Sequence, residues 1–269
     1  MGMLVGGALA ICGCAVQGVF RNPMASPYVI GISSGASCGA ALSIVLGAPQ
    51  AALPPAAFLF ALGSAFVVYA LARVGGQVPV GRLLLSGIAV SLFLSALLSF
   101  IQYVAGERQL REIVFWQMGG LWSVNWSKLL LSALPICVGA LGLLGFSKEL
   151  DALAMGEETA LDLGVEAQKI RSIVLSFASL ATAGAVCTVG VIGFVGLIVP
   201  HLIRLIVGPG HRHLLPFSLL GGAIFLSWMD LLARTVIAPS ELPVGILTAL
   251  FGAPFFLWIL RRSKKSPGW

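Results

Sequence analysis

About nine long apolar segments, separated by short polar loops, constrain this chain more than any other feature. An apolar helix of about 20 residues crosses the roughly 30 Å hydrocarbon core of a bilayer. Only 10% of the residues are charged and 58% are hydrophobic, whereas soluble domains carry about 25% charged residues. The sequence therefore predicts one all-α membrane domain over residues 1–269, with about nine transmembrane helices. The predicted spans are approximately 2–20, 28–47, 51–72, 83–104, 127–147, 172–190, 191–207, 215–238 and 243–260.

The segment 191–207 is shorter than the others and contains Gly193, Gly196 and Pro200. A backbone that is broken at membrane depth must be buried in protein or line a cavity. We therefore expect a short, broken helix here. Glycines four residues apart, such as Gly2 and Gly6, predict helices that pack closely elsewhere.

Basic residues indicate the orientation of the chain. If the loop around Arg21 faces the cytoplasm, alternation places 12 of the 16 lysines and arginines inside, which the positive-inside rule favours. The C-terminal sequence RRSKK then lies in the cytoplasm beside anionic membrane lipid, and we do not interpret it as a nucleic-acid patch. Met1 would lie outside, so we expect a further helix upstream of this chain.

The longest predicted cytoplasmic loop, 148–171, holds six of the ten acidic residues. Its leucines recur at near-helical spacing, which predicts one or two short amphipathic helices with a glycine break. Two interpretations remain open: a solvated loop between helices, or a docking surface for a cytoplasmic partner.

Motifs for covalent chemistry are weak or missing. No Gly-rich motif with a lysine for nucleotide phosphates occurs, so the chain does not hydrolyse ATP by that route. Residues 31–35 match GxSxG, but they open a membrane helix, and no histidine and acid are within reach. His211 and His213 lack helical metal-ligand spacing and a nearby cysteine, so we interpret them as part of a solvated basic loop. No cofactor or metal is predicted.

Asp230 and Arg234 are four residues apart and can pair along one helix face near its outer end. They form either a structural ion pair or a site where Arg234 faces outward to hold an acidic partner. Proton-driven pumps carry chains of buried ionisable residues, and no such chain is evident here.

Three blocks of sequence, in the same order, resemble the FecCD-type permeases, which are membrane subunits of importers for ferric siderophores, haem and vitamin B12. The first block contains RNPMASP at 21–27 and GISSGA at 31–36. The second contains GFVGLIVPHLIR at 193–204 and HRHLLP at 211–216. The third contains DLLAR at 230–234, ELPVG at 241–245 and GAPF at 252–255. The resemblance covers essentially the whole chain.

The resemblance implies a ten-helix subunit of a prokaryotic cytoplasmic membrane that works as a homodimer. Its partners would be two cytoplasmic ATP-binding subunits and an extracytoplasmic substrate-binding protein. With nine spans, the family's first helix would be missing. The implied cargo is a ferric siderophore first, with a corrinoid, haem or an oxyanion as alternatives.

Site residues also follow from the resemblance. The loop 148–171 resembles the helices that couple the permease to its ATPase, and the matching positions are Gly156, Glu157, Ala160, Leu163 and Gly164. The turn 21–27 resembles a cytoplasmic gate, with Asn22 and Met24 near the dimer axis and a second layer at Pro79 and Val80. Arg234 resembles an arginine that docks the binding protein.

The sequence thus predicts the permease subunit of a binding-protein-dependent ABC importer that has no enzymatic activity of its own. An ion-coupled secondary transporter is the first alternative, and it would need intramembrane acids. An intramembrane enzyme built on Ser33 or Ser34 is the second, and it would need a base at the same depth.

Overall fold

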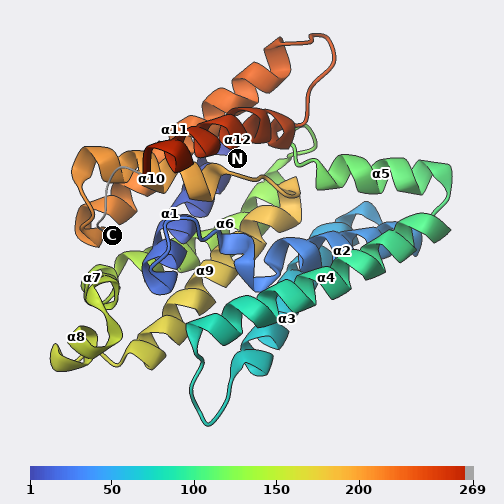
Figure 1. Cartoon of the computed structure of the whole chain (residues 1–269). Coiled ribbons are helices and arrows are strands. Elements are labelled where there is room, and N and C mark those ends of the chain that lie inside the picture. The colour runs from blue at the N-terminus through green and yellow to red at the C-terminus, as the bar shows by residue number, and fades with distance from the viewer. Residues whose placement is uncertain (264–269) are drawn as a thin grey trace.

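The computed structural model describes residues 1–263, which form twelve α-helices and two short 3₁₀ turns (Figure 1). Six helices are long and apolar enough to cross a membrane: α1 (Gly2–Phe20), α3 (Leu53–Ala72), α4 (Val80–Val104), α6 (Trp126–Leu144), α9 (Ala167–Val189) and α11 (His211–Thr235). Three further apolar stretches are shorter: α2 (Ile32–Val45), α10 (Val195–Val207) and residues Val244–Leu257 of α12 (Val244–Ser263). Each predicted apolar segment corresponds to one of these nine helices.

The remaining elements are short. They are η1 (Pro27–Ile30), η2 (Gln50–Ala52), α5 (Glu107–Gln117), α7 (Ser147–Met155) and α8 (Glu157–Asp162). Residues 148–171 thus contain two short helices, and they are separated at Gly156, as the expected glycine break predicted. Helix α5 is amphipathic and was not predicted. Lys264 and Lys265, part of the predicted cytoplasmic tail, lie outside the described residues.

Helix α1 forms the centre of the molecule. In its most apolar stretch 89% of the residues are buried, compared with 22% in α4, which fits a helix that is apolar on all sides and surrounded by protein. Glycines allow this packing. A Cβ at Gly6 would lie 2.2 Å from the carbonyl oxygen of Gly222 on α11, and one at Gly13 would lie 1.7 Å from that of Gly196 on α10. The close packing predicted at Gly6 is confirmed.

The predicted break in the segment 191–207 is confirmed only at Gly193, because Gly196 and Pro200 lie within the continuous helix α10. Residues 190–194 are irregular, Phe194 has a positive φ of 66°, and α10 begins only at Val195. A protein group satisfies one of the backbone carbonyls in this stretch, because Tyr28 donates its hydroxyl hydrogen to the Ile192 carbonyl at 2.8 Å. The side chain of Ile192 is itself buried. This is the environment that an interrupted helix at membrane depth requires.

The short elements gather at two ends of the bundle. Figure 1 shows α7, α8 and the turn between α3 and α4 at one end, with α5 and the connection from α11 to α12 at the opposite end. Large apolar side chains of α4 and α6 are exposed along their length. A lipid bilayer or a further protein subunit can cover such faces.

Candidate functional site

A cleft of about 630 Å³ lies at the end of the bundle that carries α7 and α8. It separates the last turn of α1 from the two short helices, and the first residue of α4 contributes to it. A neighbouring cleft of about 540 Å³ shares several of the same residues. The residues common to both are Val80, Glu157, Glu158 and Arg171. Residues expected in a gate and residues expected in ATPase coupling therefore line one site.

The two short helices are held together by a small apolar contact. Gly156 has a φ of 127°, which favours glycine, and the chain turns there from α7 into α8. Ala160 of α8 is fully buried and belongs to one cluster with Ala152 and Leu153 of α7. Through this contact α7 and α8 pack against each other as one unit.

The outer surface of this unit is apolar and acidic at once. Met155, Leu161 and Leu163 are 59%, 67% and 60% exposed, and the acids of α8 stand between them. Gly164 follows with a φ of 77°, and a Cβ there would meet no described atom within 4 Å. Apolar side chains gathered on a polar segment are typical of a protein interaction surface. Ala160 does not belong to this surface, because it is buried.

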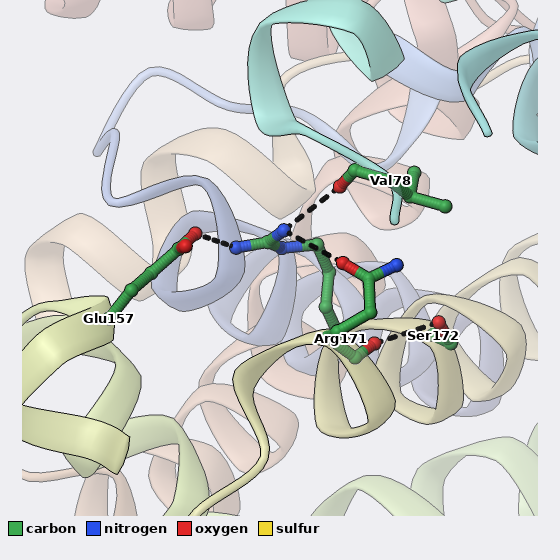
Figure 2. A network of polar contacts seen from close by, with 5 residues as sticks. Val78, Glu157, Arg171 and Ser172 are labelled. Carbon is green, nitrogen blue, oxygen red and sulfur yellow. Dashed lines mark hydrogen bonds and ion pairs between the residues drawn. The ribbon is translucent and has the colours of Figure 1, made fainter. Parts of the chain in front are cut away.

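Arg171 connects α8 to the turn that precedes α4 (Figure 2). Its side chain, in the second turn of α9, is only 5% exposed and forms an ion pair with Glu157. The same guanidinium donates to the Val78 carbonyl at 2.9 Å and, with a longer contact of 3.5 Å, to Gln168 Oε1. A buried guanidinium is costly unless it is paired and hydrogen-bonded, so these partners hold the three segments together.

A second polar contact joins α7 to α11. Asp151 Oδ1 accepts a hydrogen bond from the backbone N–H of His211 at 2.8 Å and lies 2.7 Å from its Nδ1. Because a carboxylate only accepts, Nδ1 carries the hydrogen. The imidazole is buried against α1, where a Cβ at Gly18 would lie 2.7 Å from Nε2. The interpretation of His211 as part of a solvated basic loop was therefore wrong, whereas His213 is exposed.

The predicted gate residues occupy different positions around the cleft. Val80 is half-buried and lines it directly. Asn22 and Met24 are exposed in the turn just after α1, where Asn22 Oδ1 accepts the backbone N–H of Met24 at 2.9 Å. The cleft itself is lined instead by the residues before them, Phe20 and Arg21. Val80 therefore lies beside α8, and Asn22 and Met24 continue the same turn away from it.

Arg234 lies at the other end of α11. Its Nε donates to Asp230 Oδ2 at 3.0 Å, as the spacing of four residues predicted, and its Nη1 lies 3.8 Å from Glu241 Oε1. The Arg234 side chain is 44% exposed. A helix of 25 residues is about 37 Å long, so Arg234 and the Asp151–His211 contact lie at opposite ends of one helix.

Sequence reasoning missed Arg171, Asp151 and the structural role of His211. The sequence did contain one indication that Arg171 has a partner, since it is a charged residue at the start of an apolar helix. No signal pointed to its partners, because Val78 is 93 residues away along the chain. Among the described residues, no group of three or more His, Cys, Asp or Glu side chains could hold a metal ion.

Comparisons with known proteins agree with one another. The model of the FecCD transport family matches residues 1–262. The cobalamin import system permease protein of Halobacterium salinarum is 47% identical over 97% of this chain and 70% of its own length. The hemin transport system permease protein of Yersinia pestis is 41% identical over 98% of this chain and 81% of its own length.

A solved structure of a metal-chelate type ABC transporter, in an inward-facing conformation, has the same fold. It is 37% identical, the match covers 97% of this chain and 83% of that one, and the TM-score is 0.91. The match extends over the short elements as well as the long helices, since so little of the chain lies outside it. Together with the family model over residues 1–262, it shows that this chain belongs to the FecCD transport family, the permeases of binding-protein-dependent ABC importers.

Proposed function

We propose that this chain works as a homodimeric permease that carries a metal chelate or corrinoid across a prokaryotic cytoplasmic membrane. Two ATP-binding subunits would supply the energy, and an extracytoplasmic binding protein would deliver the cargo. The observation that carries the proposal is the cleft where α8, Arg171 and Val80 meet. The residues that line this cleft can pass movement of a cytoplasmic partner bound to α8 to the start of the membrane-spanning helix α4.

The contact with the ATP-binding subunit is assigned to α7 and α8. Their exposed leucines and acids offer a surface that a complementary cleft would bury. Ala160 and Gly156 set the shape of the pair, Leu163 contributes apolar area, and Gly164 allows the chain to turn sharply after α8. Because α7 and α8 pack against each other, movement of one helix carries the other with it.

The gate is assigned to the turn after α1 and to the start of α4. Val80 lies beside α8, Asn22 and Met24 are exposed in the turn after α1, and a second copy of the chain would approach at Met24. Helix α4 has the apolar, exposed length that a dimer interface beside a cargo path requires. The permease performs no covalent chemistry, and it only has to alternate between two states whose balance the partners shift.

The orientation follows from charge. The end with Arg21, α7 and α8 is assigned to the cytoplasm together with the C-terminus, in line with the positive-inside rule. The end with α5 and Arg234 then faces outward. Arg234 is half-exposed and keeps two carboxylates close, and an acidic group on the binding protein can compete with them for its guanidinium.

The names of the relatives support a class of cargo, and experiment must identify the cargo itself. Their names include cobalamin, hemin, Fe(3+)-citrate and molybdate permeases. All of these are bulky or anionic solutes, and the binding protein would choose among them. Molybdate is the case that departs from the metal-chelate class.

Co-purification tests the proposal. The chain is expressed with the ATP-binding subunit encoded nearest to it, solubilised in detergent, and captured by a tag on the ATP-binding subunit. We expect stable capture of a complex with two copies of each, with mass photometry as the measure of stoichiometry. Replacing Leu161 and Leu163 with Asp should abolish capture, because charge on the apolar surface cannot be buried. Capture of the double variant at the unmodified level would refute the coupling assignment.

A further inference from the structure

Glu157 and Glu158 are adjacent acids in the first turn of α8, but the structure treats them differently. The side chains of both are exposed, but the carboxylate of Glu157 is paired with the buried guanidinium of Arg171, whereas Glu158 has no ion pair within the described part of the chain. A count of charges cannot separate the two. Their contacts give Glu157 a partner inside this chain that Glu158 lacks.

Arg171 is the partner of Glu157 inside this chain. It is anchored near the start of α9, a helix that is mostly buried, so its position is fixed by the membrane domain. One side of the guanidinium binds α8, and the other binds the Val78 carbonyl, two residues before α4 begins. Figure 2 shows Arg171 lying between Glu157 and Val78.

The turn that receives this contact is short and tightly folded. Residues 74 and 77 pair as an isolated bridge, Gly75 and Gly76 both have positive φ values, and the Val78 side chain is buried. A displacement of the Val78 carbonyl therefore moves Pro79 and Val80 with it. Val80 is the residue at which α4 starts and at which both clefts meet.

We propose that Arg171 is a positioning residue that transmits movement of α8 to the start of α4, through Glu157 on one side and the Val78 carbonyl on the other. The inference rests on the proposed function, because it assumes that an ATP-binding subunit moves α8. It goes further by giving Glu157 a partner inside this chain. Lysine could not replace Arg171, since one ammonium lacks the planar fork that reaches two acceptors in fixed directions.

The test measures access to Val80 in the complex with the ATP-binding subunit. Val80→Cys is introduced into a chain whose exposed native cysteine is removed by Cys137→Ala; Cys12, Cys14, Cys38 and Cys187 are buried. The rate of labelling by a charged maleimide is measured without nucleotide and with ATP plus vanadate. Couplings between sites typically change such equilibria by about 5- to 150-fold, so we expect the two rates to differ clearly.

Glu157→Ala should bring the two labelling rates together, and Glu107→Ala, which removes an exposed acid of α5 at the opposite end of the bundle, should leave their ratio unchanged. Because Glu157→Ala leaves a buried guanidinium unpaired, Arg171→Met provides a second route: it removes the guanidinium, keeps an unbranched apolar stem, and should also abolish the nucleotide dependence. Capture of the ATP-binding subunit should persist in all three variants. A purely structural role would instead reduce capture and labelling change together.

The variant that carries both Glu157→Ala and Arg171→Met tests how Glu157 acts. If it acts through Arg171, Glu157→Ala should have no further effect on the labelling ratio in the Arg171→Met background. Additive losses, or a nucleotide response that survives in Arg171→Met, would overturn the inference. If the unmodified chain captured no ATP-binding subunit, the proposed function would fail first, and the transmission role would fail with it.

Discussion

Replacing Asp151 with Ala is the perturbation whose cost the structure defines most closely. One carboxylate oxygen accepts both the backbone N–H and the Nδ1–H of His211. The backbone N–H belongs to the first turn of α11 and has no acceptor within the helix. The His211 side chain is only 4% exposed, whereas the Asp151 side chain is 38% exposed. Truncation therefore leaves two buried donors beside a partly open position.

The magnitude follows from these two donors. A buried donor left without an acceptor costs about 1–3 kcal/mol, which gives about 2–6 kcal/mol for both. Because Asp151 is partly exposed, water reaches part of the vacated site, so we expect about 2–4 kcal/mol. In a domain of this size about 1 kcal/mol corresponds to roughly 2–4 °C in Tm, so the midpoint should fall by roughly 4–16 °C.

The assay is thermal unfolding in one detergent, followed by fluorescence-detected size exclusion. Asp151→Asn keeps an acceptor oxygen and should lose less than half as much as Asp151→Ala. Asp162→Ala, at the exposed end of α8, should stay within about 0.5 kcal/mol of the unmodified chain. If Asp151→Ala behaved like Asp162→Ala, or if Asp151→Asn lost as much as Asp151→Ala, the argument from unsatisfied donors would be refuted.

Three further outcomes are expected. Gly164→Asp should keep the complex with the ATP-binding subunit but lower the cargo imported per ATP, because it places a charge beside the apolar surface of α8; an unchanged ratio would remove Gly164 from the coupling unit. Arg234→Glu should weaken docking of the binding protein at low salt and less at high salt, and docking titrated at two ionic strengths checks this; unaltered docking would leave Asp230–Arg234 as a structural pair. Gly6→Val should prevent recovery of monodisperse protein, because its Cβ would lie 2.2 Å from the Gly222 carbonyl oxygen. Gly63→Val should be tolerated, because a Cβ there would meet no described atom within 4 Å. Equal yields of the two variants would contradict the packing argument.

The long helices could be predicted because a segment buried in lipid and a segment buried in protein meet the same physical requirement. Each apolar segment must satisfy its own backbone hydrogen bonds, so apolar length alone indicates a helix. The residues at which the helices begin and end were harder to predict from the sequence. Segment 28–47 contains a separate 3₁₀ turn before Gly31, and α9 begins five residues before the predicted span because its first turn is polar. Helix α5 was missed for the same reason, since it is too polar to be detected by hydropathy.

Contacts between residues close in the sequence could be predicted at the site, whereas contacts between distant residues could not. The Asp230–Arg234 pair follows from a spacing of four residues on one helix, and the break at Gly156 follows from the conformational freedom of glycine. The contacts of Arg171 with Val78 and of His211 with Asp151 join residues 93 and 60 positions apart. Such contacts depend on how helices pack, and no local pattern encodes them. His211 was misinterpreted because histidine beside arginine resembles a solvated loop until the fold buries it.

Uptake into proteoliposomes tests the central claim most directly. The chain is reconstituted with its ATP-binding subunit, the binding protein is added outside, and radiolabelled cobalamin, haem, ferric citrate, a ferric siderophore and molybdate are offered in turn. We predict accumulation of at least one of them that requires both the binding protein and internal ATP, and that an imposed proton or sodium gradient does not replace. Accumulation driven by such a gradient without ATP would contradict the importer assignment and support an ion-coupled transporter instead.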